Sequence, residues 1–349
     1  MLPRAAGTTL ALAGMVLVAM PASTGASDTQ ALLYTAYRSG ALELRAISPD
    51  GTRARTIAKL GDRFTYGVTL SPNDQAAAVF DDAGLSVIDL RNGSRRVVAR
   101  DSAVYTWAPD SKRIAYLTTK RIAYLTYTAE VAVVRIDGSG RKRLAQQRAR
   151  RTWLPFAELA WSPDGKRVAF ANWQAYDSRH PPVGGRIGTV TMSGKQTLLQ
   201  RIRPFVPASL AWSPNSKAVA AGGFRDAGVI VVRLERAKPR YLRGTDCCVG
   251  VTPSWSPDGK RLAFLGGDTS LSYAGGVITL AGQRATVFKQ FDGARHAVWA
   301  SDSRHFAFVG CFEGDKEFRC DVYVSDGEGR VIERVEGTSG VQDLLRWSS

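Results

Sequence analysis

One short phrase recurs along the chain and limits its possible folds more than any other feature. In its fullest form the phrase reads WSPDGKRVAF, and each copy begins with Trp or Leu followed by a related turn. The copies start at Leu70, Trp107, Trp161, Trp212, Trp255 and Trp299, and a fragment, RWSS, ends the chain. Successive starts lie 37 to 54 residues apart, which is typical of architectures that repeat one supersecondary unit.

Each repeat predicts four short strands. Proline presets φ and Asp, Asn and Gly accept turn geometry, so SPDG predicts a tight turn between two strands. A second hairpin follows each phrase, as in VAVVRIDGSGRKRLA, where apolar and β-branched residues alternate around a polar turn. No window keeps a helical period for twelve residues. The pattern predicts an all-β array of four-stranded antiparallel sheets, which is a β-propeller.

The spacing also predicts the number of blades. Seven intervals tile residues 27–349, which we expect to form a single β-propeller domain. The ring closes if the C-terminal DLLRWSS supplies the inner strand of a blade whose other strands are ALLYTAY, LELRAIS and RARTIA near the N-terminus. Such a split blade removes the exposed edges of an open array. Six blades are the alternative, if the Leu70 unit or the terminal unit does not form.

The repeats resemble those of a known family. WSPDGKRVAF followed by VVRIDGSGRKRL is similar to the WD-like repeats of TolB-type propellers, periplasmic proteins of the Tol-Pal envelope system, and of the propeller domains of prolyl-oligopeptidase-type peptidases. The resemblance implies the fold and little about function, because these residues form turns and blade cores. TolB proteins have an N-terminal α/β domain and six blades, whereas this sequence predicts strands soon after residue 26 and seven units.

Residues 1–26 predict a secretory signal peptide. A basic start is followed by an apolar run, a proline and a stretch of small residues. The run is shorter than the roughly 20 residues that span a bilayer, so a retained anchor is the weaker alternative. We therefore expect a secreted or periplasmic protein with no transmembrane anchor after cleavage.

Export to an oxidising compartment determines how the four cysteines are interpreted. An even number of cysteines in an exported protein predicts disulfides. Cys311 and Cys320 flank a loop between two strands and are the favoured pair, as a staple across a hairpin. The adjacent Cys247 and Cys248 either form a vicinal bridge or remain thiols. No second CxxC and no nearby pair of histidines accompanies them, so we expect no metal site.

The predicted ligand face is the one that carries the irregular loops, because binding residues tend to lie on variable loops over a rigid scaffold. Its arginines and aromatic residues suit an anionic ligand. We expect the following residues to bind it: Arg63, Tyr66, Arg150, Arg151, Trp153, Arg203, Phe205, Arg295 and His296. The alternative is that these aromatic residues cap blade cores and these arginines are merely solvated. The repeated tryptophans are instead expected to belong to the scaffold.

The charge and the missing motifs complete the functional prediction. A formal net charge of +16 outside the cytoplasm suits an acidic protein segment or an anionic envelope polymer, or serves only solubility. The cations are spread over many units, so we expect no nucleic-acid binding. GxSxG, HExxH, phosphate-loop and GxGxxG motifs are absent.

We therefore expect a monomeric, non-catalytic binding or scaffolding protein without a cofactor, and not an enzyme. The alternative is a hydrolase or lactonase acting on a small ester, lactone or sugar at the mouth of the central channel. Its site would be built from residues of the irregular loops: His180, His296, Asp177, Asp246 and Asp268.

Overall fold

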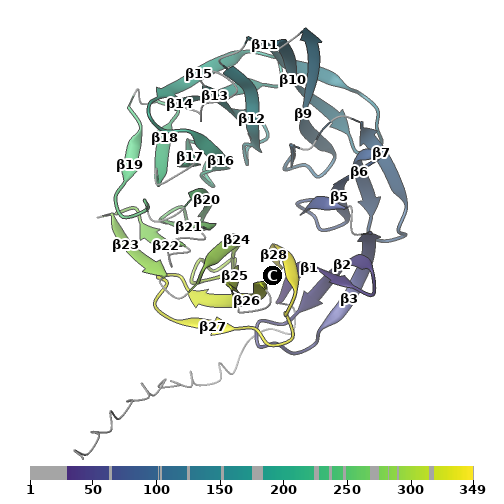
Figure 1. Cartoon of the computed structure of the whole chain (residues 1–349), viewed down its shortest axis with the longest axis vertical. Helices are drawn as coiled ribbons and strands as arrows, with labels where there is room; N and C mark the ends of the chain where they lie inside the picture. Colours follow the sequence, from purple (N-terminus) through teal and green to yellow (C-terminus); the bar gives the residue numbers. More distant parts are fainter. Residues whose placement is uncertain are drawn as a thin grey trace, which may run out of the picture.

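The computed structural model describes residues 30–62, 65–100, 102, 104–123, 126–150, 153–174, 184–223, 228–235, 238–246, 249–267, 275–281, 283–288, 291–313 and 318–348. Their strands form seven four-stranded antiparallel blades arranged in a ring (Figure 1). Within these ranges, no helix has the length and apolar character needed to cross a membrane.

The first blades follow one another around the ring. Blade 1 contains β28 (Val341–Ser348), β1 (Ala31–Arg38), β2 (Ala41–Ile47) and β3 (Arg55–Gly61). Blade 2 contains β4 (Tyr66–Leu70), β5 (Ala76–Asp81), β6 (Gly84–Asp89) and β7 (Arg95–Ala99). Blade 3 contains β8 (Tyr105–Trp107), β9 (Arg113–Ala123), β10 (Thr126–Arg135) and β11 (Lys142–Arg150).

The remaining blades repeat the same order from the ring axis outward. Blade 4 contains β12 (Trp153–Trp161), β13 (Arg167–Gln174), β14 (Gly184–Thr191) and β15 (Gln196–Ile202). Blade 5 contains β16 (Pro207–Trp212), β17 (Ala218–Gly223), β18 (Val229–Arg233) and β19 (Arg240–Leu242). Blade 6 contains β20 (Val249–Trp255), β21 (Arg261–Gly267), β22 (Gly275–Thr279) and β23 (Arg284–Phe288). Blade 7 contains β24 (Gly293–Trp299), β25 (His305–Glu313), β26 (Phe318–Asp326) and β27 (Ile332–Arg334).

The two ends of the described chain build blade 1 together. Strand β28 pairs antiparallel with β1 in a register that places Leu32 opposite Trp347. Arg346 of β28 also donates hydrogen bonds to the carbonyl oxygens of Ser71 and Pro72 in blade 2, at 3.1 and 2.6 Å. The predicted split blade and the seven-bladed ring are therefore confirmed.

The apolar core lies in the seams between neighbouring blades. Seven clusters of buried hydrophobic side chains fill these seams within the described ranges. In the seam between blades 3 and 4, Leu117 and Val131 pack with Trp161 and Phe170. Full burial of one such aliphatic or phenyl side chain stabilises a fold by roughly 1.5 to 3 kcal/mol, so each blade depends on both of its neighbours.

Three of the repeated tryptophans connect adjacent inner strands, as expected of scaffold residues: Trp212, Trp255 and Trp299. The indole Nε1 of Trp212 donates a hydrogen bond of 2.9 Å to the carbonyl oxygen of Ala160 in the preceding blade. Trp299 makes the equivalent bond to the carbonyl oxygen of Ser254, and Trp255 makes it to that of Ala211, both at 3.1 Å. A single side chain thus fills a seam and fixes the register across it.

From blade 3 to blade 7, the turns that follow the inner strands alternate in their fourth residue, which has a left-handed backbone. In blades 3, 5 and 7 this residue is a serine with φ between +57° and +61°: Ser111, Ser216 and Ser303. In blades 4 and 6 it is a glycine: Gly165 and Gly259. The equivalent residue of blade 2 is Asp74, at φ +56°. Each serine hydroxyl accepts a hydrogen bond of 3.0 to 3.1 Å from a backbone amide in the preceding blade: Asn73, Asp164 and Asp258. These bonds join blades 2 and 3, 4 and 5, and 6 and 7.

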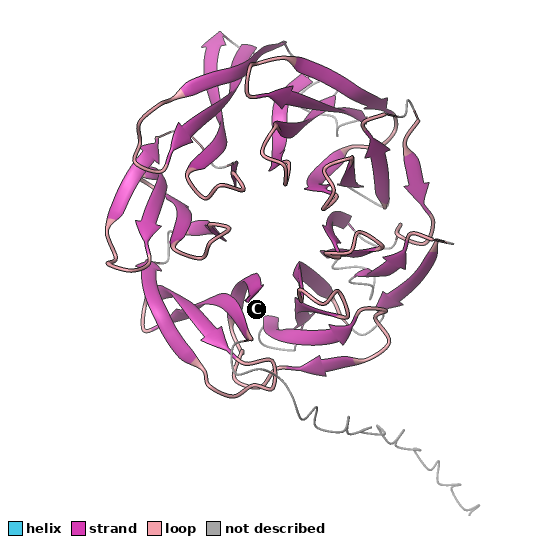
Figure 2. Cartoon of the chain, turned by 180° about the vertical axis from the view of Figure 1, so that it is seen from behind, coloured by secondary structure: helices cyan, strands magenta, loops and turns pink. Residues whose placement is uncertain are grey.

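Antiparallel connectivity gives the ring two unlike faces. The turn face carries the turns between the first and second strands and between the third and fourth strands of each blade. The loop face carries the connections between the second and third strands and those between blades. Figure 2 shows the same closed ring from behind, with the inner strands around its axis.

Candidate functional site

The inner strands of the blades share an irregularity. The antiparallel register to the neighbouring strand shifts partway along six of them: β4, β12, β16, β20, β24 and β28. Such bulges re-aim side chains and are over-represented next to active sites. They lie toward the loop face, where the sequence placed the ligand.

His296 lies in the bulge of β24 with a left-handed backbone, at φ +56°. It precedes Trp299 by three residues, as Gly67 precedes Leu70 in β4, where φ is +57°. A residue with a β-carbon is destabilised by roughly 1 to 2 kcal/mol in this conformation. Strain of this kind persists where the surrounding structure enforces it, and it clusters at active sites.

The side chain of His296 reaches across the seam to blade 1. Its Nε2 lies 3.0 Å from Oδ1 of Asp343 in β28. The buried Thr35 of β1 donates its hydroxyl to Oδ2 of Asp343 at 3.3 Å and accepts the Asp343 amide at 3.1 Å. The side chain of His296 is 40% exposed, whereas that of Asp343 is 24% exposed. This pair, the dyad of His296 and Asp343, is therefore held on one side and open to a ligand on the other.

The charges around the dyad favour an ionised carboxylate. Burial raises the pKa of Asp343, but the hydrogen bond and charge of His296 and the charge of Arg295 outweigh it, so the pKa lies below its ordinary value. An ionised Asp343 accepts the Nε2 proton of a neutral imidazole and leaves Nδ1 as its basic nitrogen.

Arg295 offers a hydrogen-bond donor beside the dyad. Its Nε is buried and has no hydrogen-bond partner within the part of the chain that is described. A buried donor without an acceptor lowers the stability of the fold by about 1 to 3 kcal/mol.

Glu158 is a second proton-transfer group on an inner strand. It is the first paired residue after the bulge of β12, opposite Ala171, and it lies three residues before Trp161, the position that His296 has before Trp299. Burial raises the pKa of Glu158 to about 7. Blade 4, which contains β12, lies across the ring from the seam between blades 7 and 1 (Figure 1).

A disulfide braces the strands that carry the dyad. Cys311 and Cys320 are bonded and directly opposite one another on β25 and β26, so the predicted pair is confirmed. Cys311 pairs with Gly293 at the start of β24, and the carbonyl oxygen of Cys320 accepts the amide of Gly340 just before β28, at 3.1 Å. The predicted alternatives for Cys247 and Cys248 lie outside the described residues.

The structure brings two of the predicted ligand residues together, since Arg295 and His296 both belong to the dyad region of β24. Phe205 is only 2% exposed and packs in the core between blades 4 and 5. Its ring therefore caps a blade core, as in the alternative interpretation. Arg203 is exposed at the end of blade 4. The structure describes only the backbone of Tyr66, Arg150 and Trp153, in β4, β11 and β12. Arg63 and Arg151 lie outside the described residues.

The residues of the predicted hydrolase alternative are only partly described. Asp246 is exposed, whereas His180, Asp177 and Asp268 lie outside the described residues. Sequence reasoning missed Asp343 and Glu158. Asp343 opens DLLRWSS, the segment recognised as the closing strand, and Glu158 stands three residues before a repeated tryptophan. Within the described ranges, no group of three or more His, Cys, Asp or Glu residues is placed to hold a metal ion.

Comparisons with known proteins identify the fold. No family model and no curated protein sequence matches the chain. Among solved structures, the periplasmic gluconolactonase of Pseudomonas aeruginosa is similar, with a TM-score of 0.62 and 13% identity over 92% of this chain and 99% of that one. A candidate 6-phosphogluconolactonase from Bacteroides uniformis has a TM-score of 0.59 and 14% identity over 91% and 98%. A candidate TolB from Agrobacterium tumefaciens has a TM-score of 0.50 and 12% identity over 91% and 93%.

These neighbours correct one prediction and confirm another. The expectation that the chain is not an enzyme is contradicted, because propellers named as lactonases match it over nearly their whole length. The physical reason is that inner strands gather isolated polar residues from many blades, so a site on this fold needs no contiguous motif. The chain has the seven-bladed β-propeller architecture and shares the TolB-like fold.

Proposed function

We propose that this protein is a hydrolase that opens a small ester or lactone at the dyad of His296 and Asp343. The observation that carries the proposal is the 3.0 Å contact between His296 Nε2 and Asp343 Oδ1, made by a histidine whose backbone is held in a left-handed conformation. Geometry of this kind serves general-base catalysis, because the carboxylate fixes the tautomer and orientation of the imidazole.

The proposed reaction assigns one step to each group. Nδ1 of His296 removes a proton from water while the water oxygen forms a bond to the ester or lactone carbonyl carbon. The carbonyl oxygen becomes an oxyanion, and the guanidinium of Arg295 donates to it. The bond between the former carbonyl carbon and the leaving oxygen then breaks, and that oxygen takes the proton from His296. An acid and an alcohol result.

The test is turnover of an ester and lactone panel by the purified protein, for example p-nitrophenyl acetate, γ-butyrolactone and δ-valerolactone. We expect His296→Ala and Asp343→Asn to lower kcat/KM by about 100-fold or more, the usual contribution of general-base catalysis. His305→Asn is the matched control, since His305 lies at the turn face against the Trp347 ring, 6.4 Å between centroids.

Two results would reject the proposal. One is absence of turnover across the panel by a folded protein. The other is turnover that His296→Ala and His305→Asn lower to the same extent, because the activity would then not depend on the dyad.

A second candidate function is binding of an acidic protein segment or an anionic envelope polymer on the loop face. Three arginines at the outer part of blade 4 favour it: burial and the nearby positive charges of Arg201 and Arg203 lower the pKa of Arg186. A bound anion would relieve this repulsion. Reduced retention of the Arg201→Ala, Arg203→Ala double variant on polyglutamate resin, at equal ionic strength, would support this function, and equal retention would reject it.

We also propose that the protein works outside the cytoplasm. The buried disulfide between Cys311 and Cys320 supports this, because such bonds persist in oxidising compartments, and the apolar segment near the N-terminus has the pattern of an export signal. Fractionation of cells that produce the full chain tests it, and a wholly cytoplasmic, uncleaved product would reject it.

A further inference from the structure

Two seams of the ring are covered on the turn face by a stacked pair of side chains. The guanidinium of Arg113, at the start of β9, lies over the ring of Trp161 in the next blade, 5.3 Å from its centroid. Arg261, at the start of β21, covers Trp299 in the same way at 5.8 Å. Each arginine is six residues after the tryptophan of its own blade.

A turn carboxylate accompanies each of these covering arginines. The Nε of Arg113 lies 2.8 Å from Oδ2 of Asp110, and Arg261 lies 3.7 Å from the carboxylate of Asp258. In both seams the carboxylate is the third residue after the tryptophan. The rule common to these two covered seams is therefore an aspartate at the third position and an arginine at the sixth.

Blade 5 breaks the rule at both positions. Asn215 stands in place of the aspartate and Ala218 in place of the arginine, so nothing equivalent covers Trp255 of blade 6. Trp255 is only partly buried, whereas the tryptophans of the covered seams, Trp161 and Trp299, are 7% and 8% exposed. At this seam the missing cover accompanies an indole that remains partly accessible.

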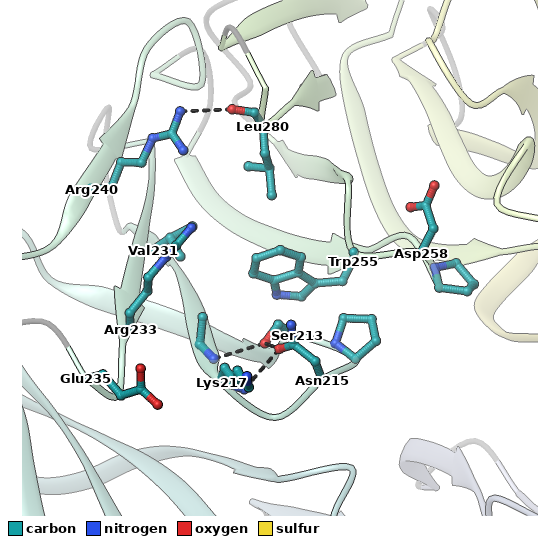
Figure 3. Close-up of a pocket in the computed structure, with 14 residues that line it drawn as sticks. Ser213, Asn215, Lys217, Val231, Arg233, Glu235, Arg240, Trp255, Asp258 and Leu280 are labelled. Carbon is teal, nitrogen blue, oxygen red and sulfur yellow. Dashed lines mark hydrogen bonds between the residues drawn. The ribbon is translucent and has the colours of Figure 1, made fainter.

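A cavity of about 530 Å³ occupies the uncovered position between blades 5 and 6. Figure 3 shows the indole of Trp255 in the middle of the lining, with Leu280 on one side and Asn215 on the other. Val231 and Ala218 contribute further apolar surface. This volume lies in the range of small-molecule sites, and an exposed indole face is suited to stacking with a flat ring.

The charged side chains around the cavity favour a ligand of negative charge. Lys217, Arg233 and Arg240 line it and are exposed, against two acids, Glu235 and Asp258. The Asp258 carboxylate already accepts hydrogen bonds from its own turn, at 2.6 and 3.0 Å. The cations therefore exceed the available acid, and a positively charged ligand would meet repulsion.

We propose that the cavity between blades 5 and 6 binds a small, flat aromatic anion. Its ring stacks on Trp255, in the space that an arginine fills at the covered seams, and its carboxylate pairs with Lys217 and Arg233. The site is on the turn face and is separate from the dyad on the loop face, so it does not depend on the proposed hydrolysis.

The seam between blades 2 and 3 provides an internal control. It also has Asn and Ala at the two positions, as Asn73 and Ala76, and its cavity is about 240 Å³. Trp107 of that seam is 8% exposed and does not line the cavity. That seam therefore lacks the accessible indole and should not bind the same ligand.

The experiment is calorimetric titration of the full protein with 2-naphthoate, compared with 2-naphthylmethylammonium and cyclohexanecarboxylate. The test variant carries Asn215→Asp and Ala218→Arg, which installs the cover that blades 3 and 6 already use. The control variant carries Asn73→Asp and Ala76→Arg in the other seam. Thermal unfolding verifies that both variants are folded.

We expect saturable binding of 2-naphthoate to the native protein and the control variant, and at least tenfold weaker binding to the test variant. The cation and the non-aromatic acid should bind at least tenfold more weakly than 2-naphthoate to the native protein. Equal affinity of the native protein and the test variant would overturn the proposal. So would tighter binding of the cation, or no saturation by 2-naphthoate up to about 10 mM.

Discussion

His296 of blade 7 and Gly67 of blade 2 occupy equivalent positions in two inner strands and have nearly the same left-handed backbone, with φ of +56° and +57°. Glycine adopts this conformation without steric conflict, and histidine does not. This difference agrees with the proposed role of the His296 side chain, since real proteins break local rules chiefly at functional sites.

The equivalence predicts that two substitutions at His296 differ in their effect on stability and agree in their effect on activity. His296→Gly should be more stable than His296→Ala by about 1 kcal/mol, because only alanine retains the backbone conflict. Both should lose the hydrolysis that depends on the imidazole. Urea unfolding of the two variants measures the difference, and an alanine variant as stable as the glycine variant would show that the backbone is not strained there.

Glu158 predicts a pH dependence of stability. Its folded-state pKa is about 7, against an ordinary value of 4.5, so the fold favours the neutral carboxyl. The stability that Glu158 contributes is complete below the ordinary value and is lost as the pH rises to about 7. Between pH values of about 4 and 8, the native protein should therefore lose up to about 3 kcal/mol relative to Glu158→Gln. Denaturant unfolding at both pH values measures it, and parallel curves for the two proteins would contradict it.

The disulfide should contribute to stability and to the geometry of the dyad. It closes a short loop, with a sequence separation of 9. Loop-closure entropy gives a stabilisation of about 2.5 kcal/mol for such a loop. Cys311→Ala with Cys320→Ala should lower the free energy of unfolding by about that amount and reduce the activity of the folded fraction, because both cysteines support strands that carry the dyad. A double variant with native stability and activity would exclude this role.

Strand β28 should be essential for cooperative folding. Removing residues 341–349 deletes the inner strand of blade 1, including the buried Val341 and Leu344, and the hydrogen bonds of Arg346 to blade 2. An open ring exposes two edges and loses one seam. We expect a noncooperative thermal transition by circular dichroism. Adding the deleted segment as a separate peptide should partly restore it, which distinguishes ring closure from general damage.

The architecture was predictable from the sequence because the same four-stranded unit is repeated many times. Each copy has the same turn and strand pattern, so a divergent copy can be interpreted by comparison with the others. The closing strand was predictable for the same reason, since Trp347 marks it as an inner strand although its turn is missing.

The candidate site was predictable only in part. His296 and Arg295 stood out as polar residues on a connection, but their partner Asp343 lies in another blade, and only ring closure brings the two together. Glu158 becomes visible only when the bulges put inner-strand positions in register. Phe205 shows the opposite error, because an aromatic residue near a predicted loop can equally well be buried in a blade core.

The hydrogen bonds accepted by the serines of the turn face have a consequence for how the number of blades can change. They join blades two at a time, and seven is odd, so one blade has no such partner. That blade is blade 1, which the two ends of the described chain assemble together. Inserting or deleting a joined pair of blades would leave every remaining serine bond intact, whereas removing one blade of a pair would leave the other without its bond. The serine bonds therefore favour changes of two blades at a time.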